Sequence, residues 1–192
     1  MEVFVIVLIS YLLGSIPFGF ILTKVFLKKD IRDIGSGNIG ATNALRTGNN
    51  LIGYSTLFLD ITKAVIPILY IKFYFHESVY LASLAVFIGH VFPIWLKFKG
   101  GKGVAVYVGI LFSINYVLGL IFIIVWLIVI LISKFSSLSS LLSALAIPIY
   151  QIMFVNYDNN YFYIIMFILI FYTHRENIKR LKNNTESKSK IY

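Results

Sequence analysis

Residues 104–133 read VAVYVGILFSINYVLGLIFIIVWLIVILIS, a run of thirty nearly uninterrupted apolar positions. A single α-helix of that length would extend about 45 Å, whereas the hydrocarbon core of a bilayer is about 30 Å thick. The more polar break at Ser113–Tyr116 would allow the run to fold as two short spans joined by a tight turn. The segment therefore predicts two consecutive transmembrane helices.

The rest of the chain has the same apolar character. Of its 192 residues, 59% are hydrophobic and 13% are charged, and a soluble domain of this size cannot bury so large an apolar fraction. We therefore expect an all-α polytopic membrane protein with seven transmembrane helices. It would form one integral-membrane domain over residues 1–192, with a flexible tail at about 183–192. The other five spans are expected at residues 3–24 (interrupted by Gly14, Pro17 and Gly19), 51–75, 79–96, 138–155 and 161–171.

The positions of the basic residues predict the orientation of these spans, because cytoplasmic loops carry an excess of lysine and arginine. With seven spans and the N-terminus outside, the inner ends collect most of the cations. Joining residues 104–133 into one span would instead place Lys134 and the basic tail outside. We therefore expect the N-terminus outside and the C-terminus in the cytoplasm. The inner cations that precede the tail are then Lys24, Lys28, Lys29, Arg32, Arg46, Lys97, Lys99, Lys102 and Lys134.

Three short polar clusters interrupt the apolar chain, and this topology places all of them on the cytoplasmic side. They are GSGNIGATNALR at residues 35–46, KFKGGKG at 97–103 and THRENIKR at 173–180. They combine cations with hydroxyl or amide side chains or with glycines that free backbone N–H groups, which is the chemistry that holds a phosphate. The clusters favour a membrane enzyme with an anionic substrate over a pore or a scaffold.

The first cluster is compatible with a phosphate site or with a structural turn. Its glycines permit positive φ angles, residues 41–45 suit a short helix, and Arg46 can grip a phosphate with two hydrogen bonds. A helix that begins after a glycine-rich turn presents unpaired N–H groups to an anion. The alternative is a re-entrant turn whose asparagines and serine only satisfy backbone groups.

The second cluster resembles a phosphate loop but is not a Walker A sequence. Lys102 is followed by Gly103, where a Walker A sequence has serine or threonine, so no hydroxyl is available for Mg²⁺ and nucleotide binding is disfavoured. Lys97 and Lys99 also fit ordinary basic flanking of a membrane span. Lys102, which lies between glycines, fits a binding role better.

The histidines differ in their surroundings. His90 lies near the inner end of the third span, where a single histidine is more often structural than catalytic, and it is kept as a candidate substrate contact. His174 opens the third cluster, and Asn177 follows one helical turn later, so both side chains can address one ligand. Asp60 and Lys63, spaced i and i+3, are expected to pair within the second span.

Composition also excludes several classes of protein. The chain has no cysteine, and its three histidines lie apart without a carboxylate cluster, so we expect no metal site and no cofactor. The net charge of +9 comes from cations at the ends of apolar spans, which indicates membrane orientation and an anionic ligand, with no nucleic-acid partner.

The clusters, in this order and spacing, resemble those of the bacterial acyl-phosphate:glycerol-3-phosphate acyltransferases, an integral-membrane family. The matching stretches are GSIPFG at residues 14–19, residues 35–48, residues 89–105, and residues 174–181 with Glu186. Asn184 stands where glycine is expected and Thr173 where a basic residue is common. Both departures lie at the edge of the third cluster, so they bear on its outermost contacts.

The resemblance implies a seven-span enzyme of the bacterial inner membrane with its active site on the cytoplasmic face. It would transfer a fatty acyl group from acyl phosphate to the sn-1 hydroxyl of glycerol 3-phosphate, giving lysophosphatidic acid and phosphate. This reaction is the first acylation step of phospholipid synthesis. We expect the two small-molecule substrates and membrane lipid as partners, and a monomer.

The same resemblance, carried over residue by residue, implies which residues are catalytic and which contact the substrates. The expected catalytic residues are Ser36, Arg46, Lys102, His174 and Asn177, with Arg46 and Lys102 as the principal phosphate clamps. The expected substrate contacts are Gly37, Asn38, Thr42, Asn43, His90, Gly100, Gly101, Gly103 and Ser140. The general base is either His174 or a phosphate oxygen of the donor, and the second is favoured because no carboxylate in the clusters is placed to orient His174.

Two other classes remain as alternatives. A carrier for phosphorylated solutes would use the same anion sites without chemistry, although no inverted repeat is visible. An assembly factor that only binds anionic headgroups would tolerate Lys102→Arg. A His-x₄-Asp acyltransferase is excluded, because Leu81, Trp95 and Lys179 stand five residues after the three histidines.

Overall fold

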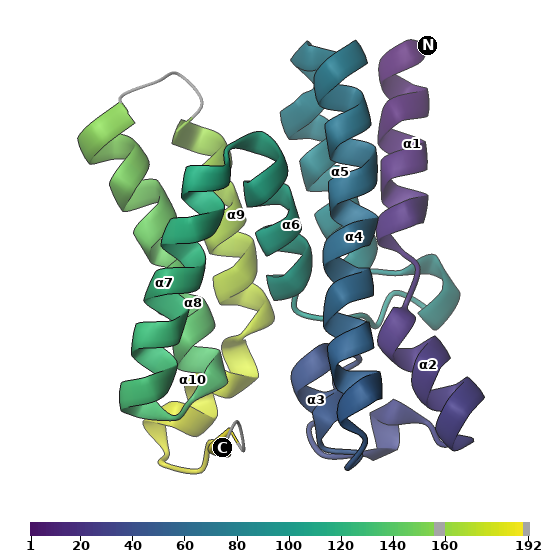
Figure 1. The fold of residues 1–192 in the computed structure, drawn as a ribbon, viewed down its shortest axis with the longest axis vertical. Coiled ribbons are helices and arrows are strands. Elements are labelled where there is room, and N and C mark those ends of the chain that lie inside the picture. Colours follow the sequence, from purple (N-terminus) through teal and green to yellow (C-terminus); the bar gives the residue numbers. More distant parts are fainter. Residues whose placement is uncertain (156–159, 190–192) are drawn as a thin grey trace. The chain divides into compact units, whose positions relative to one another are not determined.

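The computed structural model describes residues 1–155 and 160–189. Every regular element among the described residues is a helix (Figure 1). The chain divides into two compact units, Met1–Ile114 and Asn115–Tyr192. The all-helical prediction is confirmed for the described residues.

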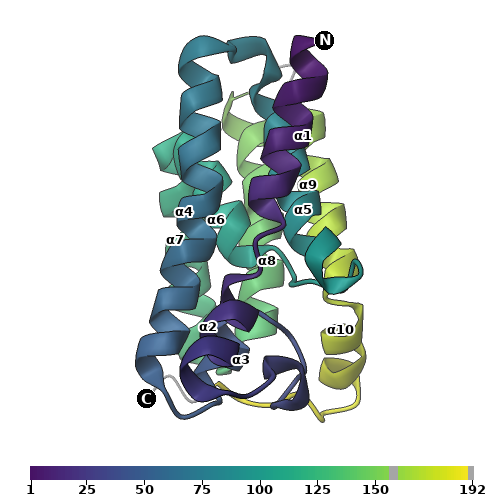
Figure 2. The same ribbon diagram turned by 90° about the vertical axis from the view of Figure 1, so that its right-hand side faces the viewer.

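The first unit contains the elements up to Ile114. In chain order they are α1 (Glu2–Gly14), α2 (Phe18–Leu27), η1 (Ile31–Asp33), α3 (Ala41–Leu45), α4 (Asn50–Tyr74), η2 (His76–Ser78), α5 (Val79–Val91), η3 (Ile94–Leu96) and α6 (Val104–Ile114). Helices α1, α4 and α5 contact one another and run side by side (Figures 1 and 2), and α6 packs on α4.

In its described residues, the second unit has four α-helices and a short π-helical turn. The elements are α7 (Tyr116–Ser133), α8 (Ser136–Tyr150), η4 (Gln151–Val155), α9 (Asn160–Thr173) and α10 (Arg175–Lys182). Helix α8 lies between α7 and α9 in the packing, with contacts to both.

The thirty-residue apolar run breaks where the sequence predicts. Helix α6 ends at Ile114, and Asn115 caps α7 by accepting a hydrogen bond from the Val117 N–H at 2.9 Å. The Nζ of Lys72 on α4 donates to the carbonyls of Ser113 and Ile114, at 2.9 and 2.8 Å. The carbonyls at the end of α6, which have no partner within the helix, are thereby satisfied.

Four helical segments among the described residues are long and apolar enough to cross a membrane. They are Glu2–Leu27, His76–Leu96, Tyr116–Ser133 and Ser136–Val155, and two shorter apolar helices are Val104–Ile114 and Asn160–Thr173. Helix α4 has 25 residues but carries Asp60, Lys63 and Lys72. A count of seven spans and the orientation of the termini stay predictions.

The interruption of the first span is confirmed, and it lies beside a close helix crossing. Helix α1 ends at Gly14, and α2 begins after Pro17. A Cβ added at Gly14 would meet the backbone of Val86, and one added at Gly89 would meet the carbonyl of Tyr11. The backbones of α1 and α5 are therefore in direct contact, as small residues allow in membrane helices.

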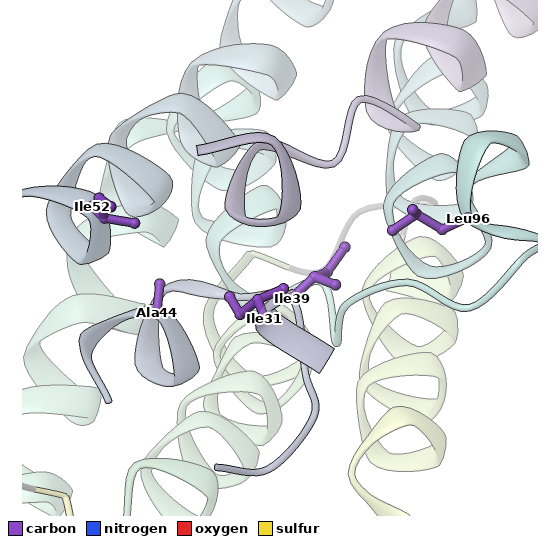
Figure 3. Packing of buried hydrophobic residues seen from close by; sticks show 5 residues of the cluster. All are labelled: Ile31, Ile39, Ala44, Ile52 and Leu96. Carbon is purple, nitrogen blue, oxygen red and sulfur yellow. The ribbon is translucent and has the colours of Figure 1, made fainter. Parts of the chain in front are cut away.

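The polar end of the first unit is built on its own apolar cluster. Figure 3 shows its buried residues, which come from η1, the loop after it, α3, α4 and η3. They are Ile31, Ile39, Ala44, Ile52 and Leu96, with Phe20, Leu22 and Leu27 packed against them. The first polar cluster and the segment that precedes the second therefore share one core.

We expect Gly14→Ala to destabilise the protein by about 1–3 kcal/mol, because the new methyl group would press on the α5 backbone. Thermal unfolding of the detergent-purified protein measures the loss. The control is Ile9→Val, a conservative change on the same helix at a side chain that is 51% exposed. Equal melting temperatures for the two variants would contradict the close crossing.

Candidate active site

The first cluster is a loop whose shape depends on one side chain, that of Asn43. This side chain is buried, and its Nδ2 donates to the carbonyls of Asn38, Ile34 and Ile31, at 2.8, 2.9 and 3.1 Å. Its Oδ1 accepts from the Ser36 N–H at 2.9 Å. The amide thus joins four points of the loop, and this use of both of its ends favours a loop-building role for Asn43. Direct contact of Asn43 with substrate stays a prediction.

Glycine supplies the backbone conformations of this loop. Gly35 and Gly37 have φ angles of +55° and +70°, in the region that disfavours other residues. A Cβ at Gly35 would meet the Oδ1 of Asn43 and the Cδ of Arg46. The stem of Arg46 therefore lies over Gly35, which needs to be glycine for this contact.

The remaining predicted residues of the loop are more open. Ser36, Thr42 and Arg46 are exposed, and Asn38 accepts from the Gly40 N–H at 2.9 Å through its Oδ1. The predicted short helix at residues 41–45 is confirmed as α3, and Arg46 caps its C-terminal end. Gly37 lies in the same turn.

The two arginines of this region differ in their partners. Arg32 forms an ion pair with Asp30 at 2.6 Å and lies over the ring of Phe20. The hydrogen bond from Arg32 lowers the pKa of Asp30 to about 2. Among the described residues, no carboxylate pairs with Arg46. Arg46 therefore offers an uncompensated guanidinium, which suits an anion clamp.

The second cluster lies on the C-terminal end of α5. The N–H of Gly100 donates to the Val91 carbonyl at 3.0 Å, and the N–H of Gly101 donates to the His90 carbonyl at 3.1 Å. Gly103 has a φ of +84°, and a Cβ there would meet the ring of Phe87. Lys102 is half-buried between these two fixed glycines, immediately before α6 begins.

His90 lies beneath this loop and is 4% exposed. Its Nδ1 is 3.0 Å from the Nζ of Lys63, which forms the predicted ion pair with Asp60 at 2.8 Å. The pairing of Asp60 with Lys63 is confirmed. His90 has packing and polar partners inside the protein, and its contact with substrate stays a prediction.

In the second unit, His174 stands at the N-terminal end of α10 and is buried. Its Nδ1 lies 2.8 Å from the Ile170 carbonyl, which can only accept, so Nδ1 carries a hydrogen. In the neutral ring, Nε2 is then the acceptor nitrogen. A backbone carbonyl orients this imidazole through Nδ1.

Asn177 is also buried, and a carboxylate fixes the orientation of its amide. Its Nδ2 donates to the Oε1 of Glu186 at 2.6 Å. Because a carboxylate only accepts, the amide oxygen must point the other way, and this Oδ1 has no hydrogen-bond partner among the described residues. The amide therefore presents a buried acceptor oxygen that no described residue occupies.

Glu186 connects the third cluster to the start of α8. It accepts from the Ser137 hydroxyl at 2.7 Å and from the Nε of Arg180 at 2.7 Å, in addition to Asn177. Burial acts to raise the pKa of Glu186, but the hydrogen bonds from Arg180, Ser137 and Asn177 together outweigh it, so the pKa lies below its ordinary value.

The described part of the expected flexible tail has defined contacts. Glu186, whose bonds are described above, belongs to this tail. The N–H of Ser189, three residues later, donates to the Lys134 carbonyl at 2.8 Å. The roles of Ser137 and Glu186 were not identified from the sequence, because 49 positions separate them. Residues 190–192 of the expected tail lie outside the described residues.

Ser140, the remaining predicted contact, lies on α8 and is 3% exposed. Its hydroxyl donates to the Ser136 carbonyl at 2.9 Å and accepts from the Trp126 indole at 3.3 Å. The first two clusters thus belong to the unit Met1–Ile114, and the third cluster and Ser140 belong to the unit Asn115–Tyr192.

Comparisons with known proteins extend over nearly the whole chain. The family model described as glycerol-3-phosphate acyltransferase matches residues 4–184. A glycerol-3-phosphate acyltransferase of Pelagibacter ubique (strain HTCC1062) is 71% identical over 192 residues, which cover 100% of both chains. One of Anaplasma marginale (strain Florida) is 48% identical over 181 residues, which cover 93% of this chain and 91% of the relative.

The chain is also similar to solved structures of a glycerol 3-phosphate acyltransferase. A crystal structure of PlsY, an integral membrane glycerol 3-phosphate acyltransferase, in its glycerol 3-phosphate form has a TM-score of 0.93. It is 35% identical, with 98% of this chain and 96% of that chain covered. The lysophosphatidic acid form of PlsY has a TM-score of 0.89, with 98% and 95% covered.

We expect Asn43→Asp to disrupt the first loop, because a carboxylate cannot donate to the three carbonyls that Asn43 holds. The melting temperature should fall, with a loss of about 1–3 kcal/mol for the unsatisfied groups. Asn38→Asp is the matched control, since its oxygen still accepts from Gly40. Equal thermal stability of the two variants would show that Asn43 does not organise the loop.

The carboxylate of Glu186 stabilises the fold above its ordinary pKa, and this stabilisation is lost as the pH falls through its lowered pKa. Glu186→Gln should therefore lower stability at neutral pH by about 1–3 kcal/mol and flatten the decline in acid. Melting curves from pH 3 to pH 7 measure both effects. The control is Glu176→Gln, at an exposed position on α10 close to Glu186 in the chain, and it should leave the decline in acid as it is in the wild type.

Proposed function

Because the chain belongs to the glycerol-3-phosphate acyltransferase family, we propose that it transfers a fatty acyl group from acyl phosphate to the sn-1 hydroxyl of glycerol 3-phosphate. The products are lysophosphatidic acid and inorganic phosphate, in the first acylation step of phospholipid synthesis. The match over residues 4–184 carries this proposal. The PlsY structures support it, because their ligands are the acceptor and the product of such a reaction.

The proposed reaction depends more on positioning the two substrates than on activating the acyl donor. Acyl phosphate is a mixed anhydride, so the sn-1 oxygen attacks the acyl carbon, the bond from that carbon to the phosphate oxygen breaks, and phosphate leaves with the electron pair. Neither a metal nor a covalent enzyme intermediate is required for a leaving group of this quality. The protein has to hold two phosphate-bearing substrates in contact and offset their repulsion.

Arg46 and Lys102 are the proposed phosphate clamps. Arg46 supports this role with a guanidinium that pairs with no carboxylate among the described residues, held over Gly35. Lys102 supports it with a position between two glycines that the end of α5 fixes. The exposed Ser36 offers a hydroxyl in the same loop as Arg46.

We assign Asn177 to a hydroxyl of the glycerol moiety. Glu186 fixes the amide so that its free Oδ1 is an acceptor, and a phosphate dianion offers no hydrogen to it. A glycerol hydroxyl, in contrast, can donate its hydrogen to this oxygen. His174, one turn earlier, would contact the same substrate.

The proton of the attacking hydroxyl goes, in this proposal, to an oxygen of the departing phosphate. The Nδ1 of His174 is oriented by a backbone carbonyl and not by the carboxylate that commonly supports a histidine base. His174 is then a binding residue. A rate that titrates with one group and disappears in His174→Gln while substrate affinity is retained would assign the proton to His174.

For the membrane, we propose seven spans, with the N-terminus outside, the C-terminus in the cytoplasm and the active site facing the cytoplasm of a bacterial inner membrane. The break between α6 and α7 supports this count, because it separates the two shorter spans that the charge pattern requires. The functional unit is a monomer in this proposal.

The test is phosphate release from palmitoyl phosphate by the detergent-purified protein, with and without glycerol 3-phosphate. We expect release that depends on glycerol 3-phosphate and yields lysophosphatidic acid. Lys102→Ala should reduce it by about 10²–10³-fold, because a charge that stabilises the transition state is lost. The neighbouring exposed Lys99→Ala is the matched control and should stay near wild type.

Two outcomes would contradict the proposal. Absence of release by a folded wild-type protein would favour the carrier of phosphorylated solutes. Equal effects of Lys102→Ala and Lys99→Ala would show that the glycine-enclosed lysine is no clamp.

A further inference from the structure

We propose that Asp60, Lys63 and His90 form a buried positioning network that seats the loop of residues 100–103 and thereby places Lys102. The proposal rests on the proposed function, in which Lys102 holds a substrate phosphate. Of the three residues, His90 touches the loop, and Lys63 contacts both His90 and Asp60.

Lys63 is the centre of the network, and its ammonium group forms one ion pair and two hydrogen bonds. Its Nζ lies 2.8 Å from the Oδ1 of Asp60, 2.7 Å from the Ile16 carbonyl and 3.0 Å from the Nδ1 of His90. A lysine ammonium group can only donate, so Nδ1 of His90 is the acceptor in this contact and the ring hydrogen lies on Nε2. The network therefore fixes the rotation of the imidazole.

The opposite edge of this imidazole supports the loop. A Cβ added at Gly101 would meet the Nε2, Cε1 and Cδ2 atoms of His90, so the loop backbone lies directly against the ring. The backbone carbonyl of His90 also accepts from the Gly101 N–H at 3.1 Å. His90 thus holds the residue before Lys102 through both its side chain and its main chain.

The network has a second attachment in the break between α1 and α2. The Ile16 carbonyl precedes Pro17, where the helix cannot continue, and Lys63 donates to it. The ammonium group also lies 5.7 Å from the centre of the Phe18 ring. The same cation therefore joins α4, the α1–α2 break and the support of the loop.

Stability alone is a weak reason for such a group of charges. Replacing both members of a buried ion pair by apolar residues is often neutral for stability, and ionisable residues inside membrane proteins commonly serve function. Asp60 and Lys63 have side chains that are each 3% exposed, so neither can reach a substrate itself. Their effect on the reaction would pass through His90 and the loop.

The experiment compares Michaelis constants for both substrates in variants of the full chain, with Lys102→Ala as the reference. His90→Phe keeps a ring but loses the acceptor for Lys63. The double variant Asp60→Leu with Lys63→Met removes both charges together and should fold. We expect each to raise, by about tenfold, the KM for the same substrate whose KM rises in Lys102→Ala, because a small displacement of a clamp weakens binding.

Two further variants separate positioning from folding. Lys72→Met removes another lysine of α4, which caps α6 and does not touch the loop, so it should lower the melting temperature and leave both KM values unchanged. His90→Asn restores an acceptor for Lys63 and should recover part of the loss seen in His90→Phe. If His90→Phe fails to fold, Gly101→Ala tests the same contact without removing a buried polar group, and it should raise the same KM.

The inference is overturned if the network variants lower only the amount of folded enzyme and leave both KM values at wild type. It is equally overturned if they raise the KM for the substrate that Lys102→Ala does not affect. Inactivity of the folded wild-type protein contradicts the proposed function instead, so the two failures are distinct.

Discussion

Inside a bilayer the polypeptide backbone finds no water, so every carbonyl and N–H group that leaves a helix has to find a partner within the protein. This chain breaks its helices several times and meets that requirement with specific groups. Lys63 donates to the carbonyl before Pro17, and Lys72 donates to the carbonyls that end α6. The loop after α5 returns its N–H groups to the last carbonyls of that helix. At these three breaks, backbone groups that leave a helix are therefore bonded to groups within the protein.

Glycine makes these solutions geometrically possible. At Gly14 and Gly89 it lets two helix backbones touch, and at Gly101 it lets a loop lie on an imidazole ring. In each place a methyl group would enter occupied space. Glycine in this chain therefore reflects close contact with neighbouring elements, both at the helix crossing and in the second cluster.

Local features of the sequence predicted local structure well. The break near Asn115, the short helix at residues 41–45 and the Asp60–Lys63 pair all depend on residues close in the chain, and all are present. Contacts across long separations were not predictable in this way. Nothing in the sequence near Glu186 indicates that its carboxylate accepts from Ser137, and nothing near His90 indicates that its ring supports Gly101. The sequence left the first cluster open between a phosphate site and a turn whose asparagines satisfy backbone groups, and the bonds of Asn43 to four backbone groups show the second role, while its contact with substrate stays a prediction.

In the proposed topology α4 crosses the membrane, and the i, i+3 placement of Asp60 and Lys63 then bears on its insertion during synthesis. A helix that carries two separate charges pays a large cost for leaving water before its partner helices are present. Here both charges belong to one helix turn, so their mutual ion pair can form within α4 as soon as that turn is helical. In that topology the nascent helix would carry its own charge compensation into the membrane, whereas the bonds to Ile16 and His90 need the α1–α2 break and α5 to be in place.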